Sequence, residues 1–166
     1  TGFARTGDWF AFHHAGVRSD VVMLAKAMGN GMPVGALWAP REIAKVFVPG
    51  DHGSTYSGTA IATAAVCAVI DIMRRIDAPR LAREKGELIT SQLQRLPAVK
   101  SVRGRGLLLG VELGEGVDAK AKQAAMLECG LVTNAVTATA LRLAPPITVT
   151  TDEIGEAMAI ITEVLA

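Results

Sequence analysis

This sequence has few of the features that would narrow a protein's function at once. Only 4% of its residues are aromatic, it contains two cysteines, and its formal net charge is +1. Lysine and arginine form no basic run, so the charge pattern gives no reason to expect nucleic acid or a membrane surface as a partner. No apolar run approaches the roughly 20 residues that cross a bilayer.

The two cysteines, Cys67 and Cys129, stand far apart and lack the spacing of metal ligands. We therefore expect free thiols in a reducing cytoplasm and no metal site. Half of the 166 residues are hydrophobic and one fifth are charged. This balance is typical of a globular protein that has one substantial core or two small ones.

Three of the few aromatic residues, Trp9, Phe10 and Phe12, lie in one segment, residues 8–15, which also contains the adjacent histidines His13 and His14. Neighbouring side chains on a helix point in different directions, and no further ligands follow at the spacings that metal sites use. We interpret the segment as an aromatic helix start that covers a sheet edge.

The most informative stretch is residues 20–37, where Asp20-Val-Val-Met-Leu-Ala-Lys26 is followed by a turn rich in glycine. Residues 21–25 form a continuous apolar run, too short for an ordinary helix and rich enough in β-branched residues for a buried strand. Glycines, an asparagine and a proline then interrupt regular structure, and a second apolar run begins at Val34.

Lys26 closes the first of these strands, and two interpretations of it are open. A lysine at the end of a strand usually points into water. A lysine that is desolvated beside a glycine turn would instead have a lowered pKa, which favours the neutral amine that attacks carbonyls and forms Schiff bases.

A second candidate site lies in Gly50-Asp-His-Gly-Ser-Thr-Tyr-Ser-Gly58, just ahead of an alanine-rich helix predicted over residues 60–76. Ser54 and Thr55 are either part of ordinary helix capping or part of an anion site, because a helix N-terminus carries partial positive charge and unpaired N–H donors. Arg142 is a third candidate. It lies on a predicted strand among apolar neighbours, where it either faces solvent or binds a carboxylate through its planar guanidinium.

The remaining pattern predicts a small α+β unit. An amphipathic helix covers residues 80–96, and a hairpin follows with strands at 99–102 and 107–113 around a turn at Gly104-Arg-Gly106. A helix at 118–129, short strands at 131–135 and 140–143, and a final helix at 154–165 with its N-cap in residues 151–153 complete the chain. We place a domain boundary near Asp77, which separates residues 1–77 from residues 78–166.

Four motifs occur in a fixed order: Thr1-Gly-Phe-Ala-Arg-Thr-Gly7, the Lys26 segment, the segment 50–58, and Arg142-Leu-Ala-Pro-Pro146. Together they resemble the class III (ornithine-type) pyridoxal-phosphate aminotransferases over nearly the whole chain. The resemblance implies an α/β fold. Residues 1–77 would be the end of a fold type I large domain with a mixed, mainly parallel sheet, and residues 78–166 a small α+β domain.

The resemblance also implies roles for the candidate residues. Lys26 would carry pyridoxal 5'-phosphate as a Schiff base, Thr55 would contact the cofactor phosphate from the other subunit of a homodimer, Ser54 would lie near the substrate, and Arg142 would bind the substrate carboxylate. The implied reaction transfers an amino group from N-acetylornithine to 2-oxoglutarate, in arginine biosynthesis. Ornithine, succinylornithine and 4-aminobutyrate are alternative donors, and a non-catalytic dimerisation module is the alternative outside enzymes.

The chain departs from the family pattern in one place, because Ser57-Gly58-Thr59-Ala60 replaces the usual Gly-Gly-Asn-Pro. We expect Thr59 to cap the following helix. The first residue falls inside a family motif, so we also expect the chain to be the C-terminal portion of a longer polypeptide. The aspartate, the stacking aromatic residue and the main phosphate loop of the family would then precede Thr1.

Overall fold

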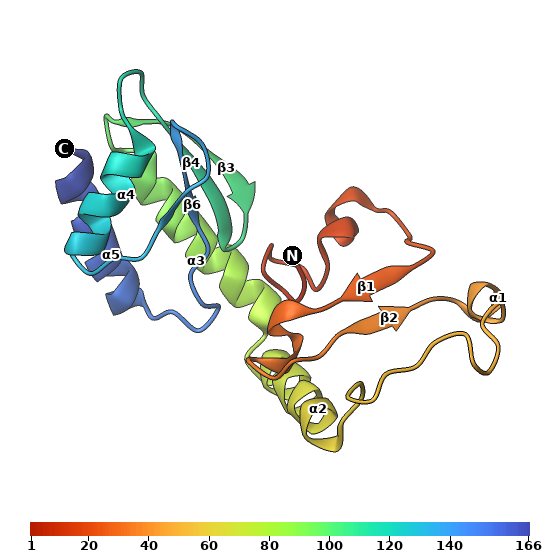
Figure 1. Ribbon diagram of the computed structural model, residues 1–166. Coiled ribbons are helices and arrows are strands. Elements are labelled where there is room, and N and C mark those ends of the chain that lie inside the picture. The colour runs from red at the N-terminus through yellow and green to blue at the C-terminus, as the bar shows by residue number, and fades with distance from the viewer.

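The computed structural model describes residues 1–166, and the chain folds into helices combined with two separate sheets (Figure 1). One sheet has two strands in the order β1-β2, and the other has four strands in the order β3-β4-β6-β5. Every strand pairing in both sheets is antiparallel. None of the helices combines the length and the apolar character that a membrane crossing requires.

The first part of the chain carries the smaller sheet. Its elements are η1 (Ala11–Ala15), β1 (Val22–Leu24), η2 (Lys26–Gly29), β2 (Ala36–Trp38), α1 (Arg41–Ala44) and α2 (Ala60–Arg75). The apolar runs predicted as strands do form β1 and β2, and they pair with Val22 opposite Trp38. In Figure 1 this hairpin extends away from the rest of the molecule, and α1 lies at its far end.

The second part begins with α3 (Ala78–Leu93) and carries the larger sheet. Its other elements are β3 (Val99–Arg105), β4 (Leu108–Leu113), α4 (Ala119–Glu128), β5 (Asn134–Ala135), β6 (Ala140–Leu143) and α5 (Thr151–Leu165). Figure 1 shows α3 running from the end of α2 to the larger sheet, with α4 and α5 beside it.

The main hydrophobic core lies between the larger sheet and helices α3, α4 and α5. Burial alternates along β4, because successive side chains of a strand point to opposite faces of the sheet. Helix α5 buries residues at helical spacing, since one face of it packs inward. The core consists of Ala82, Ile89, Leu93, Leu107, Leu109, Val111, Leu113, Ala119, Met126, Leu141, Ile154, Met158, Ile161 and Leu165.

Side-chain caps fix where two of the helices begin. The Asp118 carboxylate accepts hydrogen bonds from the N–H groups of Lys120 and Ala121 at the start of α4. Thr150 and Glu153 form a reciprocal capping box at the start of α5. The N-cap of the final helix is therefore Thr150, one residue before the predicted segment.

Three local predictions need correction. The mainly parallel sheet is not present among the strands of this chain, which are all antiparallel. Gly104 lies inside β3, and the hairpin turns at Gly106 and Leu107 because Gly106 provides the left-handed conformation, with φ 53°. Thr59 occupies the N-cap position of α2 but its side chain makes no capping hydrogen bond; instead, the Thr63 hydroxyl donates to the Thr59 carbonyl.

Candidate active site

Lys26 lies where β1 gives way to η2, and its backbone is left-handed with φ 63°. This conformation is uncommon for a residue with a side chain, and such strain gathers at functional sites. The lysine is exposed, and β1 is only half-buried, so the predicted burial of the strand is wrong for this chain, and of the two interpretations of Lys26 the exposed one describes it. The amine forms no hydrogen bond or ion pair with any other residue.

The Lys26 side chain lines a cavity of about 580 Å³ between the two parts of the molecule. Its walls come from the N-terminal loop, η2, α2 and the loop that joins β6 to α5. The lining residues are Thr1, Gly2, Phe3, Arg5, Lys26, Ala27, Asn30, Val69, Ile72, Met73, Ile76, Ala78, Ala144, Pro146, Ile147 and Thr148. A primary amine and a guanidinium thus share a cavity with many apolar walls.

Arg5 is the residue of this cavity that sequence reasoning did not single out. Its guanidinium is half-buried and donates hydrogen bonds to the carbonyls of Leu107 and Pro145, while its own carbonyl accepts from the Leu107 N–H at 2.9 Å. Burial lowers the pKa of Arg5 below its ordinary value. The available signal was a single cation inside an otherwise uncharged glycine-rich segment.

Ser54 and Thr55 are exposed in the loop that precedes α2, and neither lines the Lys26 cavity. Residues 55–58 form a turn, and the capping position of the helix itself is Thr59. Within one copy of the chain the structure therefore does not bring these two hydroxyls to Lys26.

Arg142 lies on β6, is exposed, and has no ion-pair partner in the chain. Its cross-strand neighbours are Gly110 on β4 and Asn134 on β5. Gly110 in turn faces Arg103 on β3, and the Arg103 side chain lies 3.3 Å from the place that a Cβ at Gly110 would occupy. A second arginine thus belongs to the same cross-strand row, which the sequence pattern did not reveal.

The histidines and cysteines form no further site. The His13 ring nitrogen Nδ1 lies 2.9 Å from the Asp8 carboxylate, and His14 Nε2 lies 3.0 Å from the Thr6 hydroxyl. The hydrogen bond with His13 is the main cause of a lowered Asp8 pKa. No group of three or more metal-ligating side chains occurs, and both cysteines are free and exposed.

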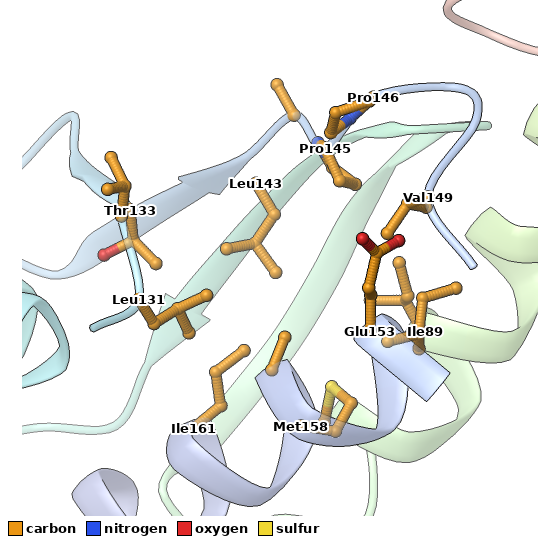
Figure 2. Close-up of a pocket in the computed structure, with 14 residues that line it drawn as sticks. Ile89, Leu131, Thr133, Leu143, Pro145, Pro146, Val149, Glu153, Met158 and Ile161 are labelled. Atoms are coloured by element: carbon orange, nitrogen blue, oxygen red, sulfur yellow. The ribbon is translucent and has the colours of Figure 1, made fainter. Parts of the chain in front are cut away.

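A second, mainly apolar cavity of about 240 Å³ lies between the larger sheet and α5 (Figure 2). Figure 2 shows Pro145 and Val149 on one side of it and Met158 and Ile161 of α5 on the other. Ala144 and Pro146 line both this cavity and the Lys26 cavity, so the segment that follows Arg142 separates the two.

Comparisons with known proteins identify the family. The sequence profile of the class III aminotransferases matches residues 1–165. Acetylornithine aminotransferase from Corynebacterium efficiens is 45% identical over 166 residues, which is 100% of this chain and 41% of that protein. Ornithine aminotransferase from Staphylococcus carnosus is 40% identical over 95% of this chain and 40% of its own length.

Solved structures agree with this result. The acetylornithine aminotransferase of Elizabethkingia anophelis superimposes with a TM-score of 0.90 at 32% identity, over 99% of this chain and 45% of that one. One structure of Toxoplasma gondii ornithine aminotransferase, with a TM-score of 0.91 at 27% identity, is described as having partial occupancy of PLP at its active site; the match covers 99% of this chain and 41% of that one. The chain spans about two fifths of the length of these relatives. It belongs to the class III aminotransferases.

Proposed function

We propose that this chain is the C-terminal portion of a pyridoxal-phosphate-dependent aminotransferase that transfers an amino group from N-acetylornithine to 2-oxoglutarate, in arginine biosynthesis. The observation that carries the proposal is Lys26, an unpaired primary amine held in a left-handed backbone conformation at the wall of a cavity. Relatives named acetylornithine aminotransferase that match almost the whole chain support the choice of donor. The family and the donor set support the cofactor.

The residues present fit the lysine end of this cofactor. Lys26 Nζ would hold its aldehyde carbon through a covalent bond, and the cavity of about 580 Å³ leaves room for a ring of that size beside the amine. When bound, pyridoxal phosphate supplies a conjugated ring that withdraws electrons from the substrate carbon.

The chain's own residues would provide proton transfer, substrate binding and phosphate binding. The Lys26 amine, once free, would move the proton at the substrate carbon, as a general base and then a general acid. Arg142 would bind the substrate carboxylate in a bidentate manner, which its exposed and unpaired guanidinium allows. Thr55 would bind the cofactor phosphate across a homodimer interface and Ser54 would approach the substrate there, consistent with their distance from the cavity of their own chain.

We further propose that residues 1–77 belong to the large domain of the enzyme and residues 78–166 form its small domain. The separation of the two sheets and the restriction of the main core to residues 82–165 support this division. The Lys26 amine would be desolvated by the preceding part of the enzyme and by the second subunit. We place the protein in the cytoplasm.

A chimera tests the proposal directly. In this chimera, the part of the Corynebacterium efficiens enzyme that precedes the matched region is fused to the N-terminus of this chain. We expect the chimera, but not the 166-residue chain alone, to convert N-acetylornithine and 2-oxoglutarate to glutamate. Ordinary turnover by the isolated chain would contradict the assignment as a portion of a larger site.

Borohydride reduction with pyridoxal phosphate, followed by mass mapping, identifies the lysine that holds the cofactor. We expect stoichiometric labelling of the chimera at Lys26, loss of labelling and activity in Lys26→Ala, and no change in the control Lys100→Ala. Labelling at a different lysine would refute the assignment.

The donor is tested separately, because ornithine aminotransferases also match the chain. Measurement of kcat/KM on the chimera ranks the four candidate donors: N-acetylornithine, ornithine, succinylornithine and 4-aminobutyrate. A higher kcat/KM for ornithine would keep the chemistry and change the donor.

A further inference from the structure

The segment between β6 and α5 connects the proposed carboxylate-binding residue to the Lys26 cavity. Arg142 lies on β6, and Ala144 and Pro146 just beyond it line the cavity. Pro145 and Pro146 have no N–H group, so the segment cannot be anchored there by donating hydrogen bonds. Its position must come from packing or from donors that reach its carbonyls.

Packing holds this segment from below only in part. Ile147 and Val149 pack against the main core, whereas Pro145 and Pro146 line a cavity. The apolar cavity of about 240 Å³ lies directly under Pro145, Pro146 and Val149, as Figure 2 shows. A void leaves its lining without dispersion contacts on that side, so the cavity provides little resistance to movement of the two prolines.

Three successive carbonyls of the segment, from Pro145 to Ile147, are each bound by a donor. The Arg5 guanidinium donates to the Pro145 carbonyl, the Val149 N–H donates to the Pro146 carbonyl at 3.1 Å, and the Lys85 ammonium donates to the Ile147 carbonyl at 2.8 Å. Two of the three donors are cations from other parts of the chain. Hydrogen bonds from charged donors are stronger than neutral ones.

Arg5 does more than bind this one carbonyl. It also contacts the β3–β4 turn through both the N–H and the carbonyl of Leu107. The same turn approaches the N-terminal loop so closely that a Cβ at Gly106 would lie 2.6 Å from the Thr6 carbonyl carbon. Arg5 is therefore held from two sides and has a fixed position from which to bind the segment.

We propose that Arg5 is a positioning residue that fixes the segment after Arg142 against the Lys26 cavity, and thereby sets where Arg142 presents its guanidinium to the substrate carboxylate. The inference rests on the proposed function for its kinetic consequence, but its structural part is independent of that function. Lys85 supports the same segment at Ile147.

Hydrogen exchange on the 166-residue chain tests the structural part. The reporter is the Val149 amide, which is bonded inside the segment, and the reference is the Leu113 amide, which donates to the Thr139 carbonyl at 2.8 Å. We expect Arg5→Met to speed exchange at Val149 at least about tenfold, the change expected for one charged hydrogen bond, with Leu113 unchanged. Arg5→Lys should give a smaller change because it keeps the charge.

The matched control is Arg95→Met, an exposed arginine that follows α3 and makes no side-chain hydrogen bond or ion pair. It should leave both amides unchanged. Unchanged exchange at Val149 in Arg5→Met would overturn the proposal. Equal acceleration at Val149 and Leu113 in both Arg5 variants would also overturn it, because Arg5 would then support the fold in general.

The kinetic part uses the chimera. We expect Arg5→Lys to raise KM for 2-oxoglutarate about tenfold and to change kcat less than about threefold, since carboxylate binding is displaced and the proton transfer by Lys26 is not. A fall in kcat with unchanged KM would overturn this role. An inactive parent chimera would count against the proposed function, while the exchange result would still decide the role of Arg5.

Discussion

Gly106 and Lys26 both have a left-handed backbone, but for different physical reasons. Gly106 needs that conformation so that the β3–β4 turn can touch the N-terminal loop, and glycine adopts it at no steric cost. Lys26 adopts it with φ 63° although a side chain makes it unfavourable. The first case is explained by packing, whereas the second fits the proposed function, in which the Lys26 amine lies at the cavity wall.

Relief of strain at Lys26 should therefore separate stability from function. We expect Lys26→Gly to be more stable than Lys26→Ala by about 1 kcal/mol, because only glycine tolerates the positive φ. Neither variant should be labelled by pyridoxal phosphate and borohydride. Urea unfolding of both variants measures the difference.

A helical position provides the control for that comparison. Ala124→Gly in the exposed part of α4 should change stability in the opposite direction, by a loss of about 1 kcal/mol. If Lys26→Gly were less stable than Lys26→Ala, the left-handed backbone at this position would be refuted.

A side chain at Gly106 should disrupt the junction between the loop and the hairpin. We expect Gly106→Ala to cost more than about 2 kcal/mol, since the new Cβ would meet backbone atoms of Thr6 and Gly7 in addition to the unfavourable φ. Gly116→Ala is matched in its positive φ but has no atom within 4 Å of the new Cβ. It should cost only about 1 kcal/mol in the same urea unfolding experiment.

At the scale of elements, the helices are defined by their ends as much as by their faces. Helix α5 has both a buried face and a reciprocal capping box between Thr150 and Glu153. Helix α2 has neither, since Ala62 is its only buried residue and Thr59 makes no side-chain cap. We therefore expect α5 to form independently of other subunits and α2 to depend on contacts outside its own chain.

Removal of the α5 cap should destabilise the larger sheet and its helices. We expect Thr150→Ala to lower the free energy of unfolding by about 1 kcal/mol, since the Glu153 N–H loses its partner. Thr151→Ala removes a hydroxyl from the same turn that is not part of the capping box, and should change stability less. Equal losses in the two variants would contradict the importance of the box.

The cap also predicts a pH dependence. Hydrogen bonds from the Thr150 N–H and hydroxyl lower the pKa of the Glu153 carboxyl. A carboxyl with a lowered folded pKa stabilises the protein above its unfolded pKa, and this contribution is lost as the pH falls through the folded pKa. The Tm difference between wild type and Glu153→Gln should therefore be constant near neutral pH and shrink below about pH 4.3. A difference that stays constant down to pH 3 would contradict this expectation.

The sequence predicts most elements of this protein because their signals are local. The β-branched run before Lys26, the amphipathic spacing of α3 and the glycine after α4 all mark elements that the structure contains. The exposure of Lys26 was not predictable, because it depends on what packs against β1 and not on β1 itself. Arg5 was missed for the same reason: its partners, Leu107 and Pro145, are distant in sequence.

At the scale of the whole molecule, the two parts differ in how well they bury apolar side chains. Most exposed large apolar side chains lie within residues 17–72, among them Met23 at 82% and Ile61 at 68% exposure. A concentration of exposed large apolar side chains in one part of a chain is typical of a surface that packs against a partner. The surface is consistent with the proposed contacts to the remainder of the enzyme and to a second subunit.

The isolated chain should therefore associate through this surface. We expect light scattering to show a mass above 17.3 kDa that rises with concentration, and the double variant Met23→Gln, Ile61→Gln to reduce it. Val132→Gln in the second part, where the side chain is 81% exposed, is the control and should have little effect. A strictly monomeric chain at high concentration would contradict this prediction.

The contact between Arg5 and Leu107 joins residues that are 102 positions apart. Such a contact closes a very long loop, which costs conformational entropy. Contacts of the N-terminal segment can offset this cost only after α3 and the β3–β4 hairpin have formed. We therefore expect the hairpin and α3 to assemble early and the Lys26 cavity to be completed in the last stage of folding. The site at which the proposed chemistry takes place would be the final structure that the chain acquires.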